Sequence, residues 1–236
     1  MNSFLLRILK RFLFHLGIKL IRIDNSKEKI IPDTSNLDLM FDVGANIGQY
    51  VKLIRNQGYA NEIVSFEPLD SAHKYLLTIS STDHKWNIFD RCAIGDRNGS
   101  TFVNVSQNSF SSSILPMLES HLDAAPESIY IGKESVPIYK LSDIYNASFK
   151  QFKRIGIKID VQGFELEVLQ GAIDIIDLVY FIQIELSLVP VYANAKLYFE
   201  IDEFLRGSGF HMWKVIPGFT HPKSGQQLQF DGIYIK

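Results

Sequence analysis

The feature that most constrains the fold is a strand, a glycine turn and a helix in immediate succession between residues 39 and 57. The run from Leu39 to Val43 is short and apolar, and Gly44 follows it directly. The next segment, from Ile47 to Gln57, has apolar residues at helical spacing, begins after a candidate N-cap at Asn46, and stops at a glycine. Similar units recur along the chain, so we expect a mostly parallel sheet with helices on both of its faces.

Several further segments have the composition of buried strands or amphipathic helices. Strands are expected at residues 63–66, 86–93, 136–141, 155–161, 178–185, 210–215 and 229–236, and helices at 71–80, 165–170 and 199–207. The last two strands are joined through a turn region and can form a hairpin. This order predicts a doubly wound α/β fold.

The 236 residues divide into a main domain and an N-terminal extension. We expect a basic amphipathic helix within residues 1–24, a linker at 25–38 and the main domain at 39–236. Inside that domain, residues 107–135 are rich in serine and contain two prolines, which indicates a lid or substrate loop. A plain surface loop is the alternative.

The segment from Phe4 to Ile23 has apolar side chains on one helical face and basic side chains on the other. Arg7 and Arg11 interrupt the apolar run, so we do not expect a cleaved signal peptide. Such a helix can lie on an anionic membrane surface, or dock on its own domain or a sister subunit. No apolar stretch reaches the length of about 18 residues that a membrane span needs.

Charge and cysteine content narrow the function classes. The sequence holds 24 Lys and Arg against 26 Asp and Glu, a net charge of −2, which argues against a dedicated nucleic-acid binder. Cys92 is the only cysteine, so an intrachain disulfide or a thiolate metal cluster cannot form. This usage fits a reducing compartment, and we expect a cytoplasmic protein, membrane-associated on the cytoplasmic face if the N-terminal helix binds lipid.

The first strand and helix have the features of a nucleoside site. Gly44 and Gly48 follow the strand, where glycine allows positive φ and a close approach of ligand to backbone. Glu67 ends the next strand, and a carboxylate near this separation accepts hydrogen bonds from a ribose diol. A tight turn beside an ordinary surface carboxylate is the alternative.

The residues around this turn narrow the choice of ligand. A dinucleotide fingerprint reads G-x-G-x-x-G, but Asn46 and Gln49 replace its second and third glycines. Asp42 adds a negative charge, which repels a pyrophosphate and suits a ligand with an ammonium and a sulfonium group. S-adenosylmethionine has both groups, a ribose and no phosphate. An NAD-dependent sugar oxidoreductase and a non-catalytic cofactor-binding scaffold are the alternatives.

At these residues the chain resembles the FkbM-family methyltransferases, which belong to the class I enzymes that use S-adenosylmethionine. The resemblance runs from Leu39 to Lys236. It is carried by the motifs FDVGANIGQY (41–50), FEPLD (66–70), AIGDRNGS (93–100), SSSI (111–114) and IKIDVQGFELEVLQGA (157–172). The resemblance implies a Rossmann-like sheet of seven strands whose last strand is antiparallel.

The resemblance also implies roles for individual residues in binding the cofactor. The methionine part would be held by Asp42, Gly44, Ala45, Asn46 and Gly48, and the ribose by Glu67. Ala93 would lie near the adenine, with Asp96 as a further candidate, and Ser112 and Ser113 would approach from the lid.

Two carboxylates are the candidate catalytic groups. Asp160 follows a buried strand at the same sheet edge as the glycine turn, where it can remove or orient the proton of an acceptor hydroxyl, with Glu185 as its partner. Alternatively, both only bind the cofactor and neighbouring loops. Gln162 stands where family members commonly carry Glu, which disfavours a carboxylate metal site, so we predict no required metal. The histidines lack ligand spacing, although His121 can approach a substrate.

These observations predict an S-adenosylmethionine-dependent O-methyltransferase. The residues themselves indicate the reaction class. The acceptor, a small molecule or a sugar hydroxyl in a glycan, glycolipid or glycosylated natural product, is implied by the resemblance alone. The basic N-terminal helix is consistent with an acceptor near a membrane.

Overall fold

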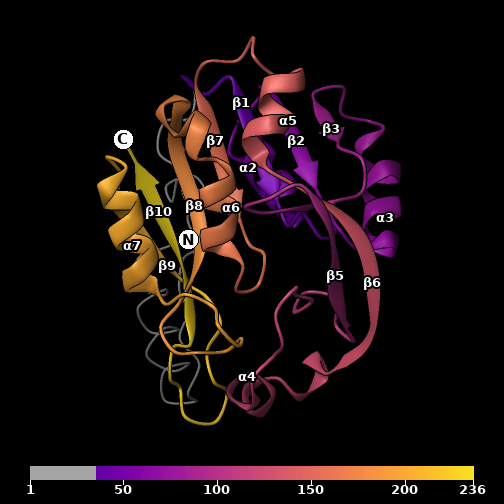
Figure 1. The fold of residues 1–236 in the computed structure, drawn as a ribbon, viewed down its shortest axis with the longest axis vertical. Coiled ribbons are helices and arrows are strands. Elements are labelled where there is room, and N and C mark those ends of the chain that lie inside the picture. The colour runs from indigo at the N-terminus through magenta and orange to yellow at the C-terminus, as the bar shows by residue number, and fades with distance from the viewer. Residues whose placement is uncertain (1–35) are drawn as a thin grey trace, which may run out of the picture. The chain divides into compact units, whose positions relative to one another are not determined.

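A seven-stranded sheet forms the centre of the computed structural model, which describes residues 36–236 (Figure 1). Its strand order is β3-β2-β1-β7-β8-β10-β9. The strands are β1 (Leu39–Val43), β2 (Glu62–Phe66), β3 (Trp86–Ile88), β7 (Ile155–Ile159), β8 (Val179–Ser187), β9 (His211–Pro217) and β10 (Gln229–Ile235). The first five strands in chain order pair in parallel, and β10 is antiparallel to both of its neighbours. The predicted seven-stranded sheet with an antiparallel last strand is therefore confirmed.

The direction in which the sheet is wound reverses at β1. This strand pairs with β2 on one side and with β7 on the other, both in parallel. Every residue of β1 and of β7 is buried, which includes the charged Asp42 and Lys158 as well as the apolar residues whose burial the sequence predicts. In open α/β sheets, ligands bind beyond the carboxyl ends of the strands at such a reversal. A ligand site is consequently expected in the crevice after β1 and β7.

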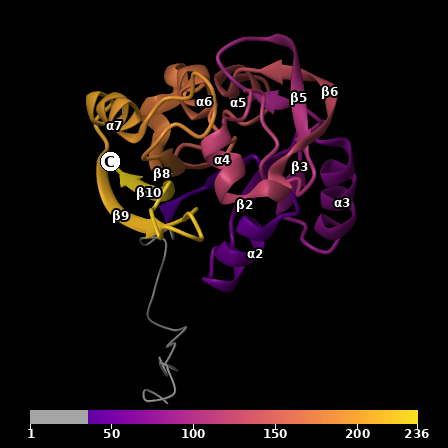
Figure 2. The same cartoon turned by 90° about the horizontal axis from the view of Figure 1, so that it is seen from below.

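Helices cover both faces of this sheet (Figure 2). On one face lie α5 (Leu141–Ser148), α6 (Glu165–Gly171) and α7 (Tyr198–Gly207), and on the other lies α2 (Gln49–Asn56). The remaining helices are α3 (Asp70–Ser80), α4 (Glu119–Ala124) and the 3₁₀ turns η2 (Pro126–Ser128) and η3 (Ile173–Leu178). Leu141, Val168 and Leu205 join the apolar strand residues in one core, so burial against the sheet stabilises these short helices.

A second, three-stranded sheet corrects the predicted elements. It has the order β4-β6-β5 and contains β4 (Ala93–Ile94), β5 (Gly99–Ser106) and β6 (Tyr130–Tyr139). The single strand predicted at 86–93 is wrong, because the chain leaves the main sheet after β3 and Ala93 pairs with Ile138 instead. The predicted loop at 107–135 contains α4 and η2, and its last residues begin β6. The strand predicted at 136–141 overlaps the end of β6, whereas β5 and the first half of β6 have many exposed residues and lack the apolar pattern of a buried strand.

The start of α2 also differs from the sequence prediction. Asn46 does not cap the helix, which begins at Gln49 after Gly48. Both Asn46 (φ 45°) and Gly48 (φ 76°) have left-handed backbone conformations that no helix continues through. The turn is therefore longer than predicted, and it leaves the side chain of Asn46 available for other contacts.

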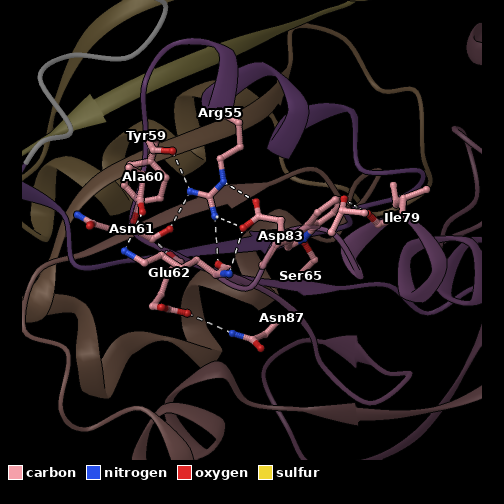
Figure 3. Close-up of polar contacts among 12 residues, drawn as sticks. Arg55, Tyr59, Ala60, Asn61, Glu62, Ser65, Ile79, Asp83 and Asn87 are labelled. Carbon is pink, nitrogen blue, oxygen red and sulfur yellow. Dashed lines mark hydrogen bonds and ion pairs between the residues drawn. The ribbon is translucent and has the colours of Figure 1, made fainter.

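Arg55 connects the turns that precede β2 and β3, at the edge of the sheet opposite the crevice (Figure 3). From the last turn of α2 its guanidinium donates to the carbonyl oxygens of Tyr59 and Asn61, each at 2.8 Å, and pairs with Asp83 at 2.8 Å. These partners precede β2 and β3. One side chain therefore fixes the amino ends of β2 and β3, and the carboxyl end of β2 faces the crevice.

The predicted helix at residues 4–23, with its possible membrane contact, lies outside the described residues, as does most of the linker at 25–38. Within residues 36–236, no helix is long and apolar enough to cross a membrane.

Two helix-ending glycines give a matched test of this packing. A Cβ on Gly171, at the end of α6, would overlap the carbonyl oxygen of Gly95, whereas a Cβ on Gly207, at the end of α7, meets nothing within 4 Å. We expect Gly171→Ala to lower the free energy of unfolding by about 1–3 kcal/mol, as overpacking does. Gly207→Ala should leave it unchanged or raise it by about 0.5–1 kcal/mol. Urea denaturation measures both, and equal effects would contradict the predicted packing at Gly171.

Candidate active site

The turn after β1 is shaped by a close contact between two backbone segments. Gly44 has φ 78°, and a Cβ at this position would overlap the carbonyl oxygen of Asp160, which directly follows β7. The amide of Asp160 in turn donates to the carbonyl oxygen of Val43 at 3.1 Å. Glycine is thus required at position 44 because of its positive φ, as the sequence indicated, and because the backbone of Asp160, rather than a ligand, approaches it closely.

Glu67 lies immediately after β2 and holds the same turn from the other side. Its two carboxylate oxygens accept hydrogen bonds from the backbone amides of Asn46 (2.7 Å) and Leu69 (2.8 Å). The side chain is buried, and burial raises the pKa of Glu67 to about 7. Each carboxylate oxygen keeps a further lone pair that can accept a hydrogen bond from a ligand hydroxyl.

A buried cation beneath the turn was missed by the sequence analysis. Lys158, on β7, donates to the carbonyl oxygen of Gly44 and to a carboxylate oxygen of Asp160, both at 3.2 Å, and lies 3.9 Å from Asp42. Asp42 is fully buried and accepts a hydrogen bond from Ser65 at 3.0 Å. The available signal was a lone lysine within the apolar strand IKI, because a buried charge requires partners.

The two candidate catalytic carboxylates are joined by one amide. The Nε2 of Gln162 donates to Asp160 at 2.7 Å and to Glu185 at 2.8 Å. Glu185, on β8, also accepts from Gln229 at 2.8 Å through the same oxygen, and burial raises its pKa well above the ordinary value. The structure therefore brings Asp160 and Glu185 together, with Gln162 placed between two groups that would otherwise repel each other.

The serine-rich segment at residues 107–135 contacts Gln162 directly. Ser113 donates to the backbone carbonyl of Gln162 at 2.6 Å, and Tyr192 donates to the side-chain oxygen of Gln162 at 2.7 Å. Gln162 itself has φ 56°, an uncommon conformation for a residue with a side chain. Ser112 accepts from the amide of Ser106 at 2.9 Å and faces the same crevice. The hydrogen bond from Ser113 holds the segment against the loop that follows β7.

A cavity of about 250 Å³ opens at the carboxyl ends of β1, β2 and β7. Eight of the predicted site residues line it: Gly44, Asn46, Glu67, Ala93, Ser112, Ser113, Asp160 and Glu185. Asp42, Ala45 and Gly48 lie behind this lining and support the turn, and Asp96 pairs with Arg97 outside it. Apolar side chains that were not predicted, including Phe66, Leu69, Ile94 and Val103, form one wall of the cavity.

Metal-ligating groups do not gather at this site. Among residues 36–236 there is no cluster of three His, Cys, Asp or Glu side chains placed to hold a metal ion. The absence of a required metal stays a prediction.

Comparison with known proteins defines the class of this protein. Residues 42–212 match the family described as methyltransferase FkbM domain, so the chain belongs to that family. No curated protein matches it. The activity class is therefore methyl transfer from S-adenosylmethionine, as the resemblance implied.

Solved structures of similar fold are distant in sequence. A putative S-adenosylmethionine-dependent methyltransferase from Listeria monocytogenes is 10% identical, with 89% of this chain and 95% of that chain covered and a TM-score of 0.49. An S-adenosylmethionine-dependent methyltransferase from Mesorhizobium loti is 8% identical, with 88% and 94% covered and a TM-score of 0.49. A putative RNA methyltransferase from Pyrococcus horikoshii is 11% identical, with 84% and 74% covered and a TM-score of 0.44.

The residues that line the cavity fit S-adenosylmethionine. The apolar wall beside Ala93 suits an adenine, and Glu67 offers acceptors for a ribose diol. The Oδ1 atom of Asn46 is buried and has no hydrogen-bond partner among residues 36–236, which leaves an acceptor for an ammonium group. The carboxylate of Asp160 adds negative charge at the same edge, where a cationic ligand is favoured.

The buried carboxyl group of Glu165 makes the stability of the fold depend on pH. Its Oε1 accepts from the amides of Val161 (3.3 Å) and Gly163 (3.0 Å), which fixes the turn that contains Gln162, and burial raises its pKa to about 7. A raised carboxyl pKa stabilises the fold at low pH, and this contribution is lost as pH rises from the unfolded value of 4.5 through about 7.

Glu165→Gln keeps the accepting oxygen and removes the titration. We expect the variant to match the wild type near pH 4.5 and to be more stable at pH 8, by up to about 3 kcal/mol at roughly 1.4 kcal/mol per pKa unit. Urea unfolding at both pH values measures the difference, with Glu203→Gln on the exposed face of α7 as the control. A stability difference between variant and wild type that is the same at both pH values would contradict the proposed cost of burying the Glu165 carboxylate.

Proposed function

We propose that this protein transfers a methyl group to a hydroxyl oxygen, and that the acceptor is a sugar in a glycan, a glycolipid or a glycosylated natural product. The observation that carries the proposal is the pair of carboxylates joined by Gln162 at the edge of the cavity. Asp160 and Glu185 both line that cavity, beside the turn that the cofactor would contact.

The carboxylate pair supplies what a hydroxyl acceptor needs. S-adenosylmethionine supplies an electrophilic methyl carbon whose sulfur leaves as a neutral thioether. A protonated hydroxyl is a weak nucleophile, and a carboxylate within hydrogen-bond reach can orient it and take its proton as the carbon–oxygen bond forms. Asp160 is the candidate for this role because about a third of its side chain is exposed, whereas Glu185 is more enclosed.

Glu185 and Gln162 would act by positioning Asp160. The Gln162 amide fixes one oxygen of Asp160, and Lys158 fixes the other. With both oxygens anchored, the carboxylate cannot rotate freely, and its remaining lone pairs have a set direction. A Glu at position 162 would replace this donor with a third acceptor and would leave the pair without its bridge.

The first test is transfer of labelled methyl groups from S-adenosylmethionine to a panel of glycosides, with the wild type and two isosteric variants. Asp160→Asn should lower kcat about 10²- to 10⁴-fold, the usual size of a general acid–base contribution, while affinity for S-adenosylhomocysteine stays within about threefold. Glu185→Gln should lower kcat less and should remove a rise of kcat/KM with pH, since burial raises the pKa of Glu185.

Two results would contradict the proposal. Methylation of amine or carbon acceptors alone would exclude a hydroxyl, and full activity of Asp160→Asn would exclude a proton-handling role for this carboxylate. Thermal unfolding of each variant verifies that any loss of activity is not a loss of fold.

A further inference from the structure

A second cavity lies beside the first and shares Phe110, Gln162 and Glu185 with it. It has a volume of about 260 Å³. The remaining lining residues come from the serine-rich segment, which includes His121 and Glu127, from the start of β10 and from the connection between β9 and β10, which includes Phe219. Glu185 and Gln162 thus stand at the boundary between the two cavities, and Asp160, which Gln162 contacts, lines the first.

His121 is the unexplained group in the second cavity. Its side chain is 3% exposed, and its ring lies between those of Tyr192 and Phe219, with centroids 5.2 and 5.0 Å away. The Nδ1 atom is buried and has no hydrogen-bond partner among residues 36–236. A buried nitrogen without a partner costs free energy, so its retention inside a cavity indicates a ligand atom that pairs with it.

The protonation state of His121 indicates what that ligand atom is. Burial lowers the pKa of His121 to about 4, and the ring is therefore neutral at physiological pH. A neutral imidazole has one donor and one acceptor nitrogen, which suits a hydroxyl group because a hydroxyl also does both. A hydroxyl can therefore pair with either ring nitrogen, whereas an ionised carboxylate or phosphate can pair only with the N–H.

Other features of the lining also favour an uncharged, ring-shaped ligand. No Lys or Arg lines the cavity within the described part of the chain, whereas the carboxylates of Glu127 and Glu185 do. An acidic ligand would thus meet acidic groups and no basic side chain in this lining. Phe110 is 53% exposed and borders both cavities, where its ring offers an apolar face to the carbon-bearing face of a sugar.

We infer that the second cavity is the acceptor subsite and that it takes a neutral polyhydroxylated ring, with His121 hydrogen-bonded to a hydroxyl other than the one that is methylated. This inference rests on the proposed function and adds to it the location and charge of the acceptor. An acceptor bound there can present a hydroxyl to the carboxylate pair across the boundary formed by Glu185 and Gln162.

The test compares His121→Phe, His121→Gln and the exposed His211→Gln as control. The probes are neutral methyl and octyl hexosides and deoxyhexosides, the matching hexuronic acids, and labelled S-adenosylmethionine. We expect neutral glycosides to be methylated with kcat/KM at least tenfold above that of their acidic counterparts. His121→Phe should raise the acceptor KM about tenfold, the loss of one hydrogen bond. His121→Gln should recover part of that loss.

A second readout separates binding from folding. His121→Phe keeps the aromatic packing and removes the unpaired nitrogen, so its Tm should equal or exceed that of the wild type. Its affinity for S-adenosylhomocysteine should also stay unchanged, because His121 does not line the first cavity.

The outcomes distinguish this inference from the function on which it rests. Methylation of glycosides with an acceptor KM that His121→Phe leaves unchanged, or with a preference for the acids, would overturn the subsite and leave O-methylation intact. No methylation of any glycoside by a protein that binds S-adenosylhomocysteine would overturn the proposed function, and the subsite with it.

Discussion

The site depends on one close contact, the approach of the backbone at Gly44 to the carbonyl of Asp160. It occurs where β1 and β7 end side by side, at the reversal of the sheet. A side chain at position 44 would separate the turn after β1 from the loop that contains Asp160 and Gln162. Only a glycine lets both segments border the same cavity, so this contact joins the turn that we expect to bind the cofactor to the carboxylate pair.

Around this contact, each carboxylate that borders the cavity accepts hydrogen bonds from neighbouring side chains or backbone amides. Lys158 pairs with Asp160 from beneath, the Gln162 amide bridges Asp160 and Glu185, and backbone amides hold Glu67. Burial still raises the pKa of Glu67 and of Glu185, which means that the fold bears a cost for keeping them. Ionisable groups whose burial costs free energy are typical of a functional site when they gather at one edge of a sheet, because interactions with a bound ligand can offset the desolvation cost.

The sequence predicted the parts of this arrangement that follow from local pattern. Short apolar strands, the glycine turn and Glu67 could be recognised because each reflects a local constraint on backbone or burial. The partners of Lys158 at Gly44 and Asp42, and the contact of Tyr192 with Gln162, could not, since the fold brings them together from distant segments. The second sheet was missed because its strands expose polar residues, and splitting the 86–93 strand depended on pairing with Ile138. His121 was noticed only as a possibility, and the structure places it in a cavity.

The most direct test of the account is calorimetric titration of S-adenosylhomocysteine, with NADH as the comparison ligand, into the wild type and Glu67→Ala. The account predicts that the wild type binds S-adenosylhomocysteine and not NADH, and that the substitution weakens this binding at least tenfold because it removes the acceptors for the ribose hydroxyls. Tight binding of NADH would revive the oxidoreductase alternative. Binding of S-adenosylhomocysteine that is unaffected by Glu67→Ala would show that the ligand does not lie over the glycine turn as described.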